Sequence, residues 1–81
     1  MAIARVIVEL KPGVLDPQGE AIKNSLHALG YEEVKKVRVG KFITLEVEGN
    51  DLKEIEERVK EMADKLLANV VIEKFTVQVE G

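Results

Sequence analysis

The chain has 81 residues, of which 46% are hydrophobic and 33% charged, and its net charge is −3. This length predicts one domain with a single core, spanning residues 1–81, and the acidic balance gives no general attraction to nucleic acid or an anionic membrane. Cysteine is absent, which excludes disulfides, thiolate metal sites and a cysteine nucleophile. No apolar run approaches the roughly 20 residues of a membrane span, and the first residues lack a secretory pattern. We therefore expect a cytoplasmic protein without a membrane partner.

Residues 2–10 predict a half-buried strand, because apolar and polar side chains alternate along them. The connector that follows, residues 10–19, contains both prolines and two of the six glycines. Proline fixes φ and glycine opens positive φ, so this connector is expected to be a rigid, shaped loop. Two interpretations are open at this point: an ordinary strand-to-helix connection or a recognition surface.

A helix is expected over residues 17–29, where apolar residues recur at helical spacing. Asp16 is suited to cap its start and Pro17 to occupy its first position. Gly30 is typical of the left-handed residue that ends a helix. His27 is the only histidine. It stands beside the apolar face of this helix, and we interpret it as a boundary residue rather than a catalytic group.

The middle of the chain predicts a hairpin. Residues 34–39 and 42–48 have strand-like patterns, and Gly40-Lys41 between them matches a Gly-first two-residue turn, as in a type II′ hairpin. The first of these two strands is strongly basic. Its default interpretation is a solvated hairpin, and the alternative is contact with phosphate or an acidic protein surface.

The last third of the chain predicts a helix followed by a strand. Residues 52–66 carry an apolar stripe at three- and four-residue spacing. Asp51 can cap this helix, and Asn69 can take the left-handed position that ends it. Residues 70–80 then alternate as a final strand.

The element order is strand, helix, strand, strand, helix, strand. Two successive β-α-β units predict an α+β, ferredoxin-like sandwich, with a four-stranded antiparallel sheet and both helices on one face. The uncovered face would carry Ile7, Phe42 and Ile72 among polar residues. Such a face is either a normal scatter of apolar surface residues or a partner interface, homomeric or otherwise. The small size of the domain favours an oligomer.

Two known uses of this element order can be weighed against the residues. An RNA-recognition motif needs stacking aromatic side chains on its central strands, and the expected first and third strands supply only Phe42, so nucleic-acid binding is not expected. The connector also lacks the Gly-Lys-Ser/Thr of a phosphate-binding loop. An amino-acid-binding regulatory module of the ACT type stays open as the alternative, and it predicts saturable binding of a small amino acid in calorimetry.

Three segments carry a family resemblance that spans essentially the whole chain. They are LKPGVLDPQG at residues 10–19, VRVGK at 37–41, and LLAN at 66–69 with VIE at 71–73. Together they resemble the PurS family, the small subunits of phosphoribosylformylglycinamidine synthase. The first segment is the most specific of the three.

The resemblance implies a non-catalytic assembly subunit of a carbon–nitrogen ligase of purine biosynthesis, which uses ATP and glutamine to make formylglycinamidine ribonucleotide. It implies a PurL-type synthetase partner that uses ATP and magnesium, and a PurQ-type glutaminase partner with a cysteine nucleophile. This chain would bridge the two and assist ammonia transfer, as a homo-oligomer (dimer or tetramer). No catalytic residue, metal or cofactor is expected in the chain itself.

The contact positions expected from the connector and the basic hairpin are Lys11, Gly13, Leu15, Asp16, Pro17, Arg38, Gly40 and Lys41. Asp16 and Pro17 already have a sufficient structural task as helix cap and first helical residue. The three cations of the set have no such task in the sequence, so they are the stronger functional candidates.

Overall fold

The computed structural model describes all 81 residues, which form three strands and two helices. In chain order the elements are β1 (Ala2–Leu10), α1 (Pro17–Ala28), β2 (Lys41–Val47), α2 (Leu52–Met62), the π-helical turn η1 (Ala63–Leu67) that continues α2, and β3 (Glu73–Glu80). The first strand and both helices lie where the periodicity of the sequence predicts them.

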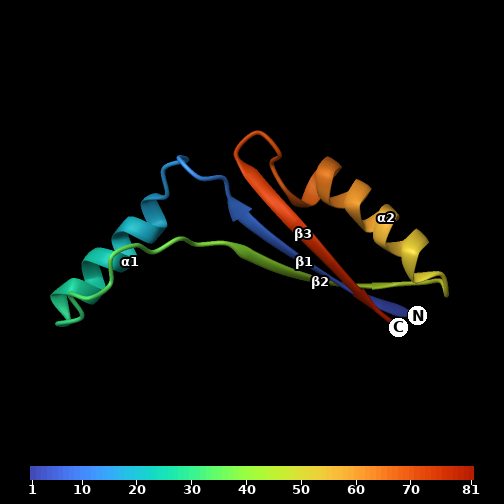
Figure 1. The fold of residues 1–81 in the computed structure, drawn as a ribbon, viewed down its shortest axis with the longest axis horizontal. Coiled ribbons are helices and arrows are strands. Elements are labelled where there is room, and N and C mark those ends of the chain that lie inside the picture. The colour runs from blue at the N-terminus through green and yellow to red at the C-terminus, as the bar shows by residue number, and fades with distance from the viewer.

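The three strands form one antiparallel sheet in the order β2-β1-β3, with β1 in the centre (Figure 1). Alternate residues of β1 point to one face, where Ala4, Val6 and Val8 are fully buried. Across the sheet, Val6 lies opposite Ile43 of β2 and Val77 of β3. One face of the sheet is therefore a continuous apolar surface, which is the period-two pattern that predicts β1.

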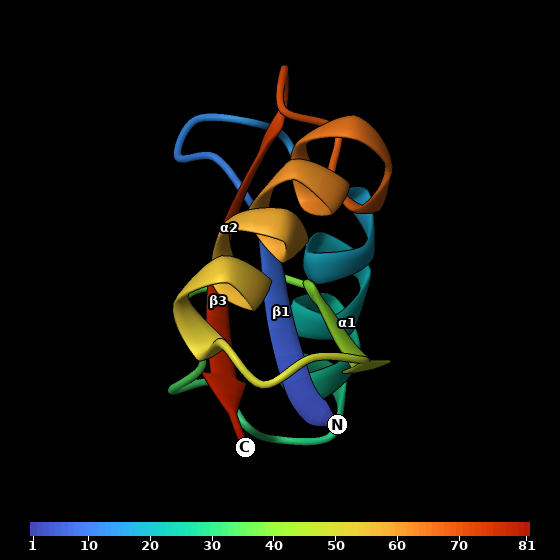
Figure 2. The same ribbon diagram turned by 90° about the vertical axis from the view of Figure 1, so that its right-hand side faces the viewer.

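Helix α2 packs against this apolar face over β1 and β3 (Figures 1 and 2). Asp51 caps its start, as predicted, by accepting the N–H groups of Lys53 and Glu54 at 3.1 and 3.3 Å. Ile55 and Val59 are the buried side chains of the helix. The resulting core is small, because only ten of the 81 residues are buried. A core of this size leaves the isolated chain little reserve of stability.

The end of α2 differs from the prediction, because no residue other than glycine has positive φ and Asn69 is therefore not left-handed. The helix widens into η1 instead, and Ala68 closes that turn by donating its N–H to the carbonyl oxygen of Ala63 at 2.9 Å. Asn69 organises the next turn, where its carbonyl oxygen accepts the N–H groups of Ile72 and Glu73 at 3.0 and 2.7 Å.

The prediction of a four-stranded sheet is wrong. Residues 34–39 form no strand, and they run as an extended segment directly into β2 (Figure 1). The expected turn is absent, because Gly40 does not have the positive φ that a Gly-first two-residue turn requires. The physical reason is a competing acceptor. The N–H of Val39, which would pair within such a hairpin, donates to the Asp16 side chain at 2.7 Å.

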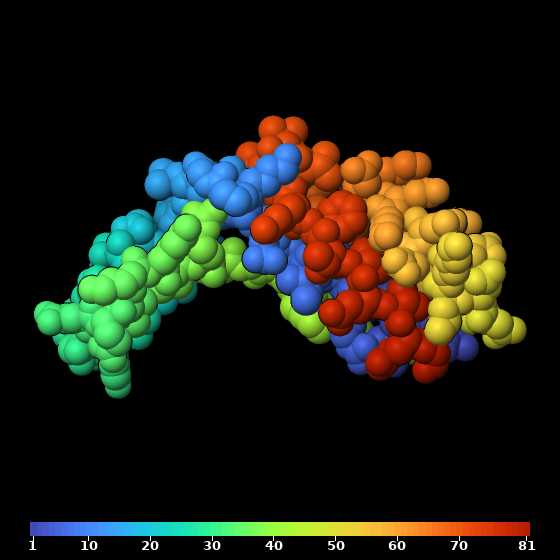
Figure 3. Space-filling view, in the orientation of Figure 1, coloured from blue at the N-terminus to red at the C-terminus, as the bar shows by residue number.

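The prediction that both helices cover one sheet face is also wrong, so the ferredoxin-like sandwich is not completed within the chain. Helix α1 packs along residues 34–40, and the two together project from the sheet as an arm (Figure 1). At the far end of the arm His27 Nε2 donates to the carbonyl oxygen of Val34 at 2.7 Å. Gly30 ends α1 with φ +102°, as predicted. The molecule measures 49 × 25 × 14 Å and has the shape of an arch (Figure 3).

The sheet face opposite α2 carries the predicted mixture of side chains, with one exception. Ile7 and Phe42 lie directly opposite each other in β1 and β2. Ile72 precedes β3 and belongs to the loop before it, not to the sheet.

Neither helix combines the length and the apolar composition that crossing a membrane would need.

Candidate partner-contact site

The eight predicted contact residues come from two segments that meet at the base of the arm. One segment is the loop 11–17, which leads from β1 into α1, and the other is residues 38–41, where the extended segment enters β2. The Arg38 side chain donates hydrogen bonds across the two segments, and the Asp16 side chain accepts one. The structure therefore brings together two stretches of chain that are more than 20 residues apart in the sequence.

Asp16 is the centre of this junction. Its side chain caps α1, as predicted, because Oδ1 accepts the N–H of Gly19 at 2.9 Å, and its Oδ2 accepts the N–H of Val39 at 2.7 Å. The residue is only 7% exposed. The hydrogen bond from Val39, then that from Gly19 and the positive charge of Arg38, hold the pKa of Asp16 below its ordinary value.

Acidification is expected to loosen the base of the arm through Asp16. Because its pKa is lowered on folding from an ordinary value of 3.8, the carboxylate stabilises the fold above pH 3.8, and that stabilisation is lost as the pH falls through the lowered pKa. The amide signals of Gly19 and Val39, followed by NMR, should move together only in this acidic range. Asp16→Asn cannot titrate there and is the control. The same pH dependence in this variant would contradict the assignment to Asp16.

Arg38 has a structural task that sequence reasoning missed. Its Nη1 donates to the carbonyl oxygen of Val14 at 2.7 Å and its Nη2 to that of Lys11 at 3.1 Å. The guanidinium group thus fixes the loop before α1 against the extended segment. The N–H of Lys11 donates in turn to the carbonyl oxygen of Ile72 at 2.8 Å. This last bond connects the loop to the start of β3.

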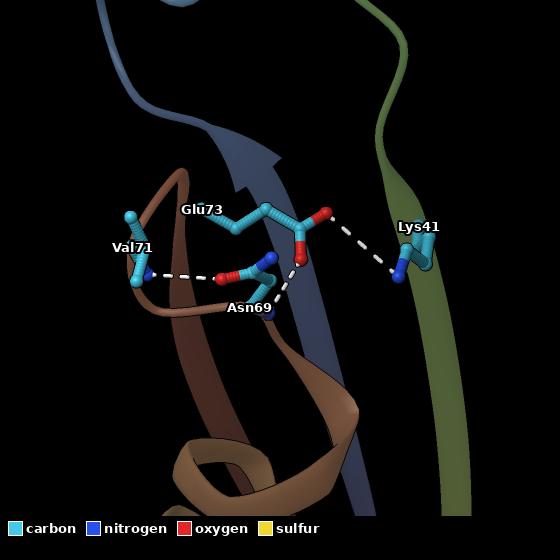
Figure 4. A network of polar contacts seen from close by, with 4 residues as sticks. All are labelled: Lys41, Asn69, Val71 and Glu73. Carbon is cyan, nitrogen blue, oxygen red and sulfur yellow. Dashed lines mark hydrogen bonds and ion pairs between the residues drawn. The ribbon is translucent and has the colours of Figure 1, made fainter.

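Lys41 belongs to a network that spans the sheet (Figure 4). Its Nζ lies 3.7 Å from Oε2 of Glu73, and Oε1 of the same carboxylate accepts the N–H of Asn69 at 2.7 Å. The side chain of Asn69 accepts the N–H of Val71 at 3.1 Å. The carboxylate is mostly buried whereas the ammonium group is largely exposed. The network therefore fixes the loop before β3, and the ion pair itself adds little stability.

The remaining predicted residues are free to meet a partner. Leu15 is 77% exposed, and Lys11 and Pro17 are exposed as well. Gly13 has φ +87°, so this turn needs glycine to present the loop as it does. Contact with a partner would remove the exposed apolar surface of Leu15 from water.

Sequence reasoning places Ile72 on the uncovered sheet face, but it misses that this residue belongs to a group of exposed apolar residues beside this loop, because it assigns residues 70–80 to one strand. The group consists of Val70, Val71 and Ile72, which precede β3 and are all exposed. The hydrogen bond between Lys11 and Ile72 places the group next to the connector. The available signal was the run of three apolar residues before the alternation begins.

Two shallow hollows lie on either side of Asp16. One, of about 250 Å³, is lined by Gly13, Leu15, Lys36 and Arg38 among others, and its neighbour of about 210 Å³ reaches Lys41. Their linings mix charged side chains with apolar groups, which suits contact with a protein surface. No cluster of His, Cys, Asp or Glu in the chain has the arrangement of a metal site.

Comparison with known families decides which family the chain belongs to. The family model PurS, described as phosphoribosylformylglycinamidine (FGAM) synthase, matches residues 3–81. The chain belongs to the PurS family. The assignment made from the three sequence segments is therefore confirmed, and with it the prediction of a subunit of this ligase of purine biosynthesis.

Individual PurS proteins are similar over nearly their whole length. The PurS subunit of Bacillus subtilis is 49% identical over 76 residues, which cover 94% of this chain and 89% of that subunit, and the subunit of Archaeoglobus fulgidus is 45% identical over 93% and 94%. The C2 crystal form of Bacillus subtilis PurS superposes with a TM-score of 0.90 at 47% identity, covering 100% of both chains. A chain of the solved PurLQS from Thermotoga maritima gives a TM-score of 0.86 at 36% identity over 99% of both chains.

Proposed function

We propose that this PurS chain is the non-catalytic assembly subunit of the synthase, which holds a PurL-type synthetase and a PurQ-type glutaminase together and assists ammonia transfer between them. Membership of the PurS family carries the proposal. The solved PurLQS of Thermotoga maritima, which contains a chain of the same fold, supports a three-component assembly. We also propose that the synthetase partner binds the ATP and magnesium, and that the complex is cytoplasmic.

The base of the arm is the surface we assign to one of these partners. It offers the exposed side chains of Lys11 and Leu15 on a loop that Arg38 and Asp16 hold in one conformation. A rigid loop loses less conformational entropy on binding than a mobile one, so more of the contact energy remains as affinity. This geometry suits a subunit that binds other proteins and does not itself catalyse a reaction.

Reconstitution from separate subunits tests the function. The synthetase, the glutaminase and this chain are mixed, and turnover is measured once with glutamine and once with ammonia as the nitrogen source. Leaving out this chain should abolish the glutamine-dependent reaction, while the synthetase keeps its ammonia-dependent reaction. The complex of synthetase and glutaminase should also disappear from a native mass measurement. Full glutamine-dependent turnover in the absence of this chain would refute the proposal.

The arm also leaves two surfaces without a cover, which supports the homo-oligomer. On α1, Ile22 is 44% and Leu29 is 74% exposed. On the sheet, α2 packs over β1 and β3, so the apolar residues of β2 on the same face, Ile43, Leu45 and Val47, are only partly buried. We propose a two-fold dimer in which the α1 of each copy covers the β2 of the other. The extended segment of each arm then lies along the free edge of its partner's β2.

Ile22→Glu is expected to weaken this dimer by at least about 100-fold, because the two-fold contact would bury the exposed part of the isoleucine twice and each buried, unpaired carboxylate adds a further cost. Sedimentation equilibrium across a concentration series measures the change. Asn24→Glu is the matched control, since this residue is exposed in the same helix two positions further on and therefore points to another side. Equal dissociation constants for the two variants would place the contact elsewhere.

A further inference from the structure

The same chain segments could complete the sheet in two ways. A turn at Gly40-Lys41 would fold residues 34–39 back onto the edge of the β2 of their own chain, and α1 would follow. In the extended form the same segments reach the β2 of a second copy. Because the same apolar residues of α1 and β2 are available to both forms, the hinge that sets the direction of the arm bears on the balance between them. This inference rests on the proposed dimer and asks what sets that balance.

One amide hydrogen decides whether the hinge can close. In a hairpin with a two-residue turn, the residues that flank the turn exchange both of their backbone hydrogen bonds. With Gly40 and Lys41 in the turn, those residues are Val39 and Phe42. The N–H of Val39 instead donates to Asp16 Oδ2 at 2.7 Å. Since an amide carries one hydrogen, this bond and the closing bond of the hairpin exclude each other.

The surroundings of Asp16 hold the arm in the extended direction. Arg38 binds the carbonyl oxygens of Val14 and Lys11 at 2.7 and 3.1 Å, and Lys11 is bonded to the loop before β3. Gly40 lies against β1, where a Cβ would come within 2.6 Å of the carbonyl oxygen of Val8. The base of the arm is thus attached to β1 and β3.

We propose that Asp16 is a conformational selector that keeps the arm open for exchange between copies, by occupying the amide of Val39 that would otherwise close a hairpin. Its cap on α1 and its bond to Val39 use different carboxylate oxygens, so one side chain serves both tasks. The two tasks can be separated by substitution.

Asp16→Ser performs that separation. Serine is a good N-cap, so its single, short hydroxyl keeps the bond to Gly19, whereas the bond to Val39 is lost. A two-fold dimer contains this bond twice, so its dissociation constant should rise by about the square of the ten- to hundred-fold equivalent of one hydrogen bond to a charged group, that is by roughly 10²- to 10⁴-fold. Sedimentation equilibrium gives this constant, and X-ray scattering should show the released monomer to be more compact than the extended chain. Asp51→Ser is the matched control, because it changes the cap of α2 alone.

Arg38→Gln is the second variant, and it leaves the cap of α1 intact should Asp16→Ser fail to fold. It should also raise the dissociation constant of the dimer. Lys36 is an exposed residue nearby, and Lys36→Gln should leave the constant unchanged. Folded Asp16→Ser with the dissociation constant of the wild type overturns the role of Asp16 but leaves the dimer intact. A wild-type chain that is monomeric at every concentration overturns the exchange itself.

Discussion

Gly19→Ala is expected to push α1 away from the extended segment of the arm and to lower the free energy of unfolding by about 2–3 kcal/mol. The Cβ of an alanine at this position would stand 2.1 Å from the carbonyl oxygen of Val37 and 2.9 Å from its carbonyl carbon. These atoms belong to the backbone, so no side-chain rotation relieves the contact. The extended segment has to move, and the bond between Val39 and Asp16 moves with it.

Helix propensity acts in the opposite direction in this variant. Alanine is favoured over glycine by about 1 kcal/mol in a helix interior, and the gain is smaller in the first turn, where Gly19 lies. The steric term is the larger one because the approach is far below van der Waals contact. Urea denaturation measures the difference, and sedimentation should report a weakened dimer. Asn24→Ala, exposed in the same helix, is the control and should be neutral or slightly stabilising. If the Gly19→Ala protein were as stable as this control, the close approach of Gly19 to the Val37 backbone would not limit the side chain at this position.

The elements that sequence reasoning placed correctly are those determined by local rules. The alternation along β1 and the caps at Asp16, Gly30 and Asp51 each involve residues within a few positions of one another. Capping and side-chain periodicity depend only on such neighbours. These features are readable from one sequence because no distant residue competes for the groups involved.

The strand expected at residues 34–39 is missing because of a long-range contact, which no local rule describes. Gly40-Lys41 is a good local turn signal, but the amide needed to close the turn is taken by Asp16, 23 positions earlier. The apolar stripe of α1 is a similar case, since it predicts a buried face, yet Ile22 and Leu29 are exposed in the single chain. It does not say whether the surface that covers this face belongs to the same chain. The local pattern therefore predicts an apolar face on α1. The direction of the arm at Gly40 determines which surface can cover it.

The sequence predicts the segments of the candidate site but not the bonds that hold them. The prolines and glycines of the connector exceed what a simple connection needs, and Leu15 is exposed on it. Arg38 has no structural task that the sequence reveals, yet it donates to Val14 and Lys11. Such long-range bonds from a side chain to the backbone leave no periodic trace in a sequence. Its contact with a partner stays a prediction, and its role in shaping the loop is observed.

Ile55→Ala should produce the largest loss of stability in the chain, about 2–5 kcal/mol. Ile55 is 5% exposed and is the largest of the buried core side chains, so its truncation leaves a cavity that the partly buried side chains around the core can fill only in part. A domain of this length has about 4–12 kcal/mol of stability in total. The substitution therefore removes a large part of it, and α2, the only helix packed on the sheet, should detach.

Leu52→Ala is the matched control, since it removes a side chain of the same size from the same helix at a site that is 41% exposed. Partial exposure means that less apolar surface is lost from the folded state, so the cost should be less than half of that at Ile55. Urea denaturation compares the two variants. Equal losses would contradict the difference in burial between the two positions, and with it the assignment of Ile55 to the core between α2 and the sheet.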